Sequence, residues 1–193
     1  IDAILATGVE VKMNQNIGTE EMKEIHKFYD ATYVAIGAHT DKKLGLEGED
    51  SKNVISAVDM LREIGDGKYP DYTGKRVVVV GGGNVAMDCA RTAIRANAET
   101  VSIVYRRRQE DMTALPAEVE GAVAEGIELV TLKAPLRVEA DAEGNACALW
   151  VQPQIIGPVR GGRPSPRKAN KPEERMECDI VLVAIGQDIV SQP

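Results

Sequence analysis

An alternation of strands and helices in the middle of the chain constrains the fold most. The run RVVVV (76–80) is β-branched without polar alternation, as expected of a strand buried on both faces. Glycines end this run, and residues 84–98 then repeat small and apolar side chains every four positions, which is typical of a helix. Residues 100–105 and 127–132 have the composition of further buried strands, with a helix expected over 116–126 between them. Strands that alternate with helices in this way predict a parallel sheet with right-handed crossovers.

The C-terminal part of the chain follows a different pattern. The segments LRVEA (136–140) and CALWVQPQII (147–156) flank a DAEGN turn and predict antiparallel ribbons. Residues 157–175 are rich in proline, glycine and arginine and are expected to form an exposed loop, which could also dock an acidic partner. Residues 179–186, DIVLVAIG, predict one more buried strand.

The first sixty residues carry weaker signals. VEVKM (9–13) alternates like a strand, and TYVAIG (32–37) has the composition of a buried one. Thr19 is placed to cap a short helix between them. Ser56, with Asp59 three positions on, predicts a capping box at the start of another helix.

The glycine-rich turn at residues 81–86, Gly-Gly-Gly-Asn-Val-Ala, fits the pattern G-x-G-x-x-A between a predicted strand and a predicted helix. Gly81 would permit the tight turn, Gly83 would let the backbone approach a pyrophosphate, and Ala86 would let the helix pack close to the strand. The free amides and the dipole at the start of the helix favour negative charge. The turn therefore predicts dinucleotide binding, with a purely structural glycine turn as the alternative.

The end of the second strand indicates which dinucleotide the site favours. A site for NAD usually places Asp or Glu about 20 residues after the glycine turn, where the carboxylate bonds the ribose 2′-hydroxyl. Here three arginines, 106–108, follow the strand, and no carboxylate occurs before Glu110. Guanidinium groups bind phosphate oxygens through paired donors, whereas a carboxylate would repel them. The cluster predicts NADP(H) in preference to NAD(H), with a solvated run of charge as the alternative.

Composition excludes several other classes of protein. With 193 residues, a net charge of −7 and 4% aromatic side chains, the chain is not expected to bind nucleic acid. Its apolar runs are shorter than the roughly 18 residues of a membrane helix, so no membrane attachment is expected. Its cysteines form no CxxC pair, which argues against a metal site and suits a reducing, cytoplasmic compartment.

The predicted fold is α/β, a Rossmann-like three-layer dinucleotide-binding domain with a parallel sheet and an antiparallel β-meander.

Several segments together resemble one protein family. They are VVVVGGGNVAMDCARTAIR (77–95), VSIVYRRR (101–108), EVEGAVAEGIEL (118–129) and DIVLVAIGQ (179–187), preceded by DATYVAIGAHTDKKLGLEGED (30–50). This set resembles the small (β) subunit of NADPH-dependent glutamate synthase and its relatives, the NADPH:flavin–iron–sulfur electron-transfer subunits. The resemblance covers nearly the whole chain.

The resemblance implies an architecture larger than this chain. The full family protein carries an N-terminal cysteine-rich iron–sulfur region and a flavin domain split around an NADPH domain, as in flavoproteins with two dinucleotide-binding domains. Residues 1–60 would then be a partial flavin-domain segment and connector, and residues 61–193 the NADPH-binding domain. NADPH would give hydride to FAD, and electrons would leave singly through iron–sulfur clusters. The implied partners are the rest of the same chain and a large glutamate synthase-type or other acceptor subunit.

Carried over residue by residue, the resemblance marks a candidate cofactor site. Residues 81–86 would hold the pyrophosphate, and residues 184–186 would line the crevice at a strand end. Arg106 and Arg107 would hold the 2′-phosphate. Asp88 would contact the nicotinamide end or a flavin-side cation, or would only face solvent. The candidate cofactor-binding residues are Gly81, Gly82, Gly83, Asn84, Val85, Ala86, Asp88, Arg106, Arg107, Ala184, Ile185 and Gly186. No catalytic residue is predicted, because hydride transfer depends on positioning and its chemistry belongs to the cofactors. No metal ligand is predicted either.

The sequence departs from the full family pattern in two ways. It has one glycine-rich phosphate loop and no cysteine cluster, so the chain alone is not expected to hold FAD or an iron–sulfur cluster, and by itself it is expected to be inactive. Two other functions remain open, a free-standing NAD(P) dehydrogenase and a non-catalytic dinucleotide-binding or docking domain. Against the dehydrogenase, the chain has no Tyr-x-x-x-Lys pair and leaves little length for a substrate domain.

Overall fold

The computed structural model describes residues 1–189, which form two compact units. One consists of residues 1–38 together with Ile189, and the other spans His39–Asp188. The second unit includes residues 39–60, which the predicted domain division assigned to the flavin-domain segment. That division concerns a longer protein and stays a prediction.

The first unit contains two helices and no sheet among its described residues. Helix α1 spans Asp2–Leu5 and helix α2 spans Thr19–Phe28. The residue that caps α2 is Gly18, whose amide donates to the Glu21 carboxylate at 3.1 Å, so the prediction that Thr19 is the cap was wrong by one position.

Two predicted strands of the first unit, residues 9–13 and 32–37, are not strands in the structure. Tyr33 is 93% exposed, and Val34 and Ile36 are also exposed. A strand is stabilised by the neighbour with which it exchanges hydrogen bonds and packs side chains. Neither segment has such a neighbour among the described residues, so an apolar, β-branched composition was not enough.

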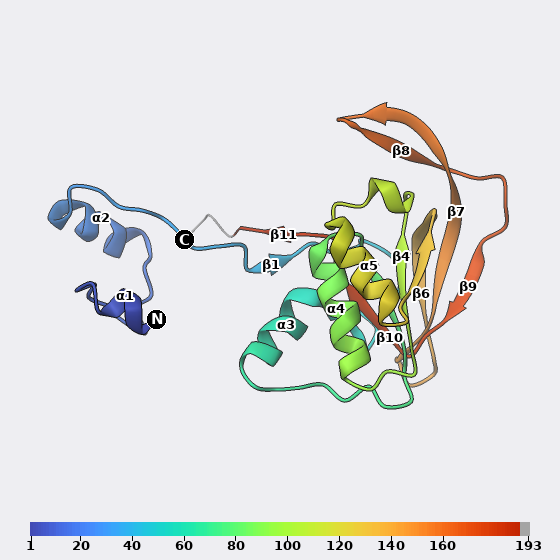
Figure 1. Ribbon diagram of the computed structural model, residues 1–193, viewed down its shortest axis with the longest axis horizontal. Coiled ribbons are helices and arrows are strands. Elements are labelled where there is room, and N and C mark those ends of the chain that lie inside the picture. Colours follow the sequence, from blue (N-terminus) through green and yellow to red (C-terminus); the bar gives the residue numbers. More distant parts are fainter. Residues whose placement is uncertain (190–193) are drawn as a thin grey trace. The chain divides into compact units, whose positions relative to one another are not determined.

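The second unit is built on a five-stranded sheet in which every pairing is parallel, as predicted (Figure 1). The spatial order is β2-β10-β3-β4-β5. These strands span Val54–Ser56 (β2), Ile180–Val183 (β10), Arg76–Val80 (β3), Thr100–Tyr105 (β4) and Glu128–Thr131 (β5). Because the chain leaves β3 toward β4 and β5, and places β10 on the other side of β3, the strand order reverses between β3 and β10.

Helices cover one face of this sheet (Figure 1). They are α3 (Ala57–Gly65), α4 (Asn84–Arg95) and α5 (Pro116–Ala124). The Ser56 hydroxyl caps α3 by accepting a hydrogen bond from the Asp59 amide at 3.3 Å, so the helix begins where the sequence predicted. The return bond of a capping box is not found among the described residues, because the Asp59 carboxylate pairs with Arg62 instead. A proline at the first position and Gly126 in a left-handed conformation (φ +91°) bound α5.

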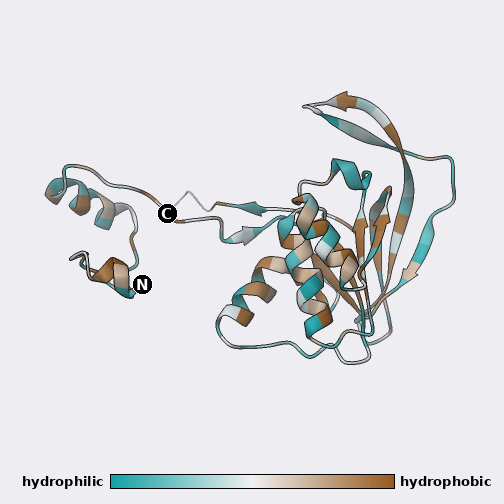
Figure 2. Cartoon of the chain, viewed as in Figure 1, coloured by the Kyte–Doolittle hydropathy of each residue, from teal (hydrophilic) through white to brown (hydrophobic). Residues whose placement is uncertain are grey.

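An antiparallel sheet covers the other face. Its strands are β6 (Lys133–Ala140), β7 (Ala146–Arg160), β8 (Arg163–Lys168) and β9 (Glu174–Glu177). In β3, Val77 and Val79 pack against the helices, whereas Val78 and Val80 pack against the antiparallel sheet. This explains why the sequence of β3 shows no polar alternation. Figure 2 shows the resulting concentration of apolar residues in the strands between the two covering layers, which confirms the predicted three-layer α/β fold.

The predicted exposed loop 157–175 is largely a β-hairpin. Strand β7 continues to Arg160, and Gly161 and Gly162, both with positive φ (+57° and +77°), form the two-residue turn into β8. Proline and glycine indicated a loop, but among the described strands β8 pairs only with β7 and is an edge strand, where proline is tolerated.

Three short features complete the second unit. Strands β1 (Thr40–Asp41) and β11 (Gln187–Asp188) pair antiparallel, and a 3₁₀ turn spans Gln109–Asp111. None of the helices in residues 1–189 has the length and apolar character needed to cross a membrane.

Candidate functional site

The glycine turn begins where β3 ends, next to the end of β10. The Gly81 amide donates to the Val104 carbonyl at 3.1 Å, and the Ala184 amide donates to the Val80 carbonyl at 2.9 Å. A Cβ at Gly81 would lie 2.3 Å from the Ala184 carbonyl oxygen. Only glycine fits there, because the neighbouring atom is backbone that cannot move aside.

Gly82 is held from two sides. A Cβ on this residue would lie 2.5 Å from Cε2 of the Tyr105 ring. Its carbonyl oxygen accepts hydrogen bonds from the amides of Thr113 at 2.9 Å and Ala114 at 3.1 Å. The loop after β4 therefore folds back onto the glycine turn and fixes its orientation.

The turn leaves several amides free at the start of α4. Gly83 is the N-cap residue, and its carbonyl accepts from the Ala86 amide at 3.0 Å. Within residues 1–189 the amides of residues 82–85 donate to no protein acceptor. Unpaired amides at a helix N-terminus form a binding site for anions. The Asn84 side chain accepts from the Leu115 amide at 2.9 Å and so links the starts of α4 and α5.

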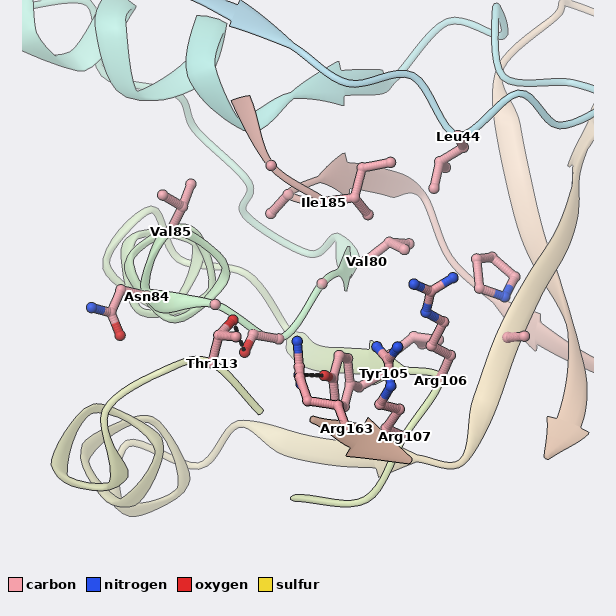
Figure 3. A pocket seen from close by; sticks show the side chains of 18 of the residues that line it. Leu44, Val80, Asn84, Val85, Tyr105, Arg106, Arg107, Thr113, Arg163 and Ile185 are labelled. Atoms are coloured by element: carbon pink, nitrogen blue, oxygen red, sulfur yellow. Dashed lines mark hydrogen bonds between the residues drawn. The ribbon is translucent and has the colours of Figure 1, made fainter. Parts of the chain in front are cut away.

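A cavity of about 570 Å³ opens at this point (Figure 3). Its lining comes from the carboxyl ends of β3, β4 and β10, with additions from the segment after β1, the loop before α5, β6 and β8. In open α/β sheets, ligands bind at the carboxyl ends of the strands where the strand order reverses. The lining residues are Leu44, Leu46, Val80, Gly81, Gly82, Gly83, Asn84, Val85, Val104, Tyr105, Arg106, Arg107, Thr113, Ala134, Pro135, Arg163, Ala184, Ile185 and Gly186.

The charged residues of this lining are three arginines, Arg106, Arg107 and Arg163, and no carboxylate is among the described lining residues. Figure 3 shows their side chains grouped on one side of the cavity. Within residues 1–189 none of the three forms an ion pair. A concave site with uncompensated positive charge favours an anionic ligand.

The third arginine of the RRR run has a different environment. The Arg108 guanidinium bonds both carboxylate oxygens of Asp111, at 3.0 and 3.1 Å. This hydrogen bonding lowers the pKa of Asp111. Arg108 is therefore neutralised locally and does not line the cavity.

Ten of the twelve predicted site residues line the cavity. The exceptions are Ala86, which is fully buried where α4 meets β3, and Asp88, which is exposed on the outer side of α4. A Cβ at Gly81 would meet the Ala86 methyl group at 3.2 Å, so Ala86 sits at the close helix–strand contact that the motif requires.

Sequence reasoning missed Arg163, Tyr105, Thr113 and Leu44. Arg163 lies in the segment interpreted as an exposed loop and reaches Tyr105 across 58 residues of sequence. The Gly161-Gly162 pair between two apparent strand ends was the one signal of a hairpin that could have placed it.

The cysteines and histidines were weaker candidates for a site. Burial raises the pKa of the Cys89 and Cys178 thiols to about 12, so both stay protonated at neutral pH. Among the described residues no three His, Cys, Asp or Glu side chains converge as metal ligands would.

A parallel sheet with a glycine turn at its switch point, a free helix N-terminus and a basic cavity defines a Rossmann-like dinucleotide-binding domain. Residues 2–192 match the family model described as pyridine nucleotide-disulphide oxidoreductase. The chain belongs to this family, and the expected resemblance to NADPH-dependent oxidoreductase subunits is confirmed.

Curated relatives carry related names. The chain is 39% identical to the NADP(+)-dependent formate dehydrogenase subunit beta of Moorella thermoacetica, covering 97% of this chain and 27% of that protein. It is 39% identical to an NADPH-Fe(3+) oxidoreductase subunit beta of Geobacter sulfurreducens, covering 97% of this chain and 29% of that one. It is 32% identical to the glutamate synthase [NADPH] small chain of Escherichia coli, covering 93% of this chain and 40% of that one. The chain thus spans less than half the length of these relatives.

Solved structures show the same fold. FprA of Mycobacterium tuberculosis, determined in complex with NADPH, superposes with a TM-score of 0.72 at 20% identity, over 89% of this chain and 53% of that chain. Thioredoxin reductase of T. acidophilum superposes with a TM-score of 0.58 at 19% identity, over 77% of this chain and 41% of that one.

Proposed function

We propose that the chain is the NADPH-binding module of a larger flavin- and iron–sulfur-dependent oxidoreductase, similar to the glutamate synthase small subunit. The observation that supports this most is the cavity at the switch point. Free amides of the glycine turn line it, together with three arginines and no carboxylate among the described lining residues. The amides can donate hydrogen bonds to the pyrophosphate of a dinucleotide, and the guanidinium groups can bind its 2′-phosphate.

In this proposal the residues that bind the cofactor are those expected from the sequence. The amides of the glycine turn hold the pyrophosphate, and Arg106 and Arg107 hold the 2′-phosphate. Ala184, Ile185 and Gly186 line the crevice. Asp88, which is exposed and does not line the cavity, remains a candidate contact for the nicotinamide end or for a cation on the flavin side.

The reaction proposed for the whole protein is transfer of a hydride from NADPH to FAD, with electrons leaving through iron–sulfur clusters. The residues of this chain contribute binding and orientation. Because the sequence has one glycine-rich phosphate loop and no cysteine cluster, FAD and the clusters are proposed for other parts of the protein. The proposed partners are the rest of the same chain and an electron-accepting subunit, which the names of the relatives as subunits and small chains support.

The proposed compartment is the cytoplasm. Its support is that Cys89, Cys147 and Cys178 are all free thiols in the structure, as is usual in reducing compartments.

Anaerobic mixing of the full-length protein with NADPH tests the proposal. Oxidised flavin absorbs at about 450 nm, and we expect this absorbance to bleach within the turnover time because the flavin accepts the hydride. A protein that binds NADPH but holds no flavin would instead be the non-catalytic dinucleotide-binding domain. A flavin-free protein that oxidises a small substrate with NADP⁺ would be a free-standing dehydrogenase.

A further inference from the structure

A third cavity-lining arginine, Arg163, comes from a hairpin far from the arginine run in sequence. It lies on β8 directly after the Gly161-Gly162 turn, and its side chain lines the same cavity as Arg106 and Arg107, next to Tyr105 (Figure 3). No sequence motif for nucleotide binding includes this position, because it belongs to the antiparallel layer and not to the strand–helix–strand unit.

Neutral groups hold the Arg163 guanidinium in place. Its Nη2 donates to the Tyr105 hydroxyl oxygen at 2.6 Å and to the main-chain carbonyl of Asp111. The Tyr105 hydroxyl in turn donates to the same Asp111 carbonyl at 2.9 Å. The ring of Tyr105 packs against Gly82, so this network connects Arg163 to the glycine turn.

These contacts orient Arg163 without neutralising it. Both acceptors are uncharged, and within residues 1–189 Nε and Nη1 of Arg163 donate to no protein group. An oriented guanidinium that keeps its charge and part of its donor fork is suited to bind a phosphate. Arg108, whose fork is occupied by the Asp111 carboxylate, shows the contrasting arrangement.

A second contact fixes the hairpin at the site. Nε of Arg107 donates to the main-chain carbonyl of Pro164, the residue after Arg163, at 2.8 Å. The start of β8 is therefore bonded to the loop after β4 through Arg107 and through Tyr105. These bonds, and not a chance contact of an exposed loop, hold Arg163 in the cavity.

We propose that Arg163 binds the 2′-phosphate of NADPH together with Arg106 and Arg107, so that the β7–β8 hairpin contributes to the choice of NADPH over NADH. This inference rests on the proposed function, since it assumes that the cavity takes NADPH. It adds a specificity-determining residue from the antiparallel layer of the fold.

Calorimetric titration of the full-length protein with NADP⁺ and with NAD⁺, at one salt concentration, tests the inference. The oxidised cofactors bind without transferring electrons. For Arg163→Gln we expect NADP⁺ affinity to fall by about 10-fold or more, which is about 1.4 kcal/mol, while NAD⁺ affinity stays within about two-fold. Arg163→Lys keeps the charge without the fork and should give a smaller loss on NADP⁺ alone.

Arg167→Gln is the matched control, because Arg167 is exposed on the same strand and does not line the cavity. It should change neither affinity. Equal losses of NADP⁺ and NAD⁺ in the Arg163 variants would show that Arg163 only supports the hairpin, and unchanged NADP⁺ affinity would show that it does not bind the phosphate. Either result overturns the inference, and Arg163→Lys decides it if Arg163→Gln does not fold.

The wild-type titration separates this inference from the proposed function. A wild-type preference for NADP⁺ that Arg106→Gln removes but Arg163→Gln leaves intact refutes the role of Arg163 alone. A wild-type protein without any preference for NADP⁺ refutes both.

Discussion

Gly82→Ala tests how the glycine turn is built, because the structure assigns the three glycines different tasks. Gly82 has a negative φ that alanine can adopt, so its backbone conformation does not require glycine. Its restriction comes from the Tyr105 ring, whose Cε2, Cδ2 and Cζ would lie 2.5, 2.6 and 2.9 Å from an alanine Cβ. The expected defect is therefore steric and specific to one neighbour.

The size of the effect follows from these distances. Ordinary contact begins near 3.4 Å, so the ring or the turn must move by roughly 1 Å. The ring cannot move freely, because the Tyr105 hydroxyl bonds Asp111 and Arg163. Overpacking of this kind costs about 1–3 kcal/mol. For a chain of this size we expect the melting temperature to fall by about 2–4 °C for each kcal/mol.

Urea unfolding followed by Trp150 fluorescence measures this cost, since Trp150 is the sole tryptophan of the sequence and lies in β7 of the second unit. Gly83→Ala is the matched control. A Cβ at Gly83 meets only Thr113 Oγ1 at 3.3 Å, so the free energy of unfolding should fall by less than about 1 kcal/mol while nucleotide affinity falls.

A double-mutant cycle identifies the cause. If Tyr105 is the obstacle, Gly82→Ala should cost almost nothing in a Tyr105→Ala background, which gives a coupling energy of about 1 kcal/mol or more. Equal destabilisation by Gly82→Ala with and without the ring would refute the reasoning, as would a larger loss of stability for Gly83→Ala than for Gly82→Ala.

Three further predictions concern charge, packing and pH. Arg106→Ala with Arg107→Ala should weaken NADPH binding far more than NADH binding in parallel titrations, and equal losses would exclude a 2′-phosphate contact. Leu182→Ala should lower the free energy of unfolding by about 2–5 kcal/mol in urea titrations, because Leu182 is fully buried between the sheet and the helices; a loss below about 1 kcal/mol would contradict this packing. Hydrogen bonds from Arg175 and from the indole of Trp150 lower the pKa of Glu139 from 4.5 to about 2. The charge of Glu139 therefore stabilises the fold above pH 4.5, and this contribution is lost as pH falls toward 2. The stability difference between wild type and Glu139→Gln should shrink over that range, and a difference independent of pH would refute the assignment.

The central part of the fold could be predicted from the sequence because its determinants are local. The β3 run, the glycine turn and the α4 periodicity are contiguous, and a chain of alternating strands and helices has few allowed topologies. Val77 to Val80 lack polar alternation because both faces of β3 are covered, which the sequence indicated directly.

The secondary-structure predictions were wrong where the structure of a segment depends on the strand with which it pairs. Residues 9–13 and 32–37 have strand-like composition but no hydrogen-bonded neighbour among the described residues. In residues 157–175, proline and glycine indicated a loop, although Gly161 and Gly162 form a hairpin turn and Pro164 lies on an edge strand. Local composition does not show which strand a segment will pair with.

The candidate site also contains residues that the sequence predicted and residues that only the structure placed there. The glycine turn and Arg106 are recognisable because they belong to one strand–helix–strand unit. Arg163 is not, since its place in the cavity depends on a hairpin turn and on Tyr105, 58 residues earlier. The different roles of Arg107 and Arg108 also required the structure, because only the fold shows that Arg108 meets the Asp111 carboxylate.

Titration of the chain with NADPH and with NADH, at one fixed salt concentration, tests the central claim most directly. The free amides of the glycine turn and the cluster of three arginines predict that both cofactors compete for one site. They also predict that NADPH binds about 10-fold or more tightly, a difference of about 1.4 kcal/mol. Equal affinities, a preference for NADH, or no binding by a chain that circular dichroism shows to be folded would contradict the account.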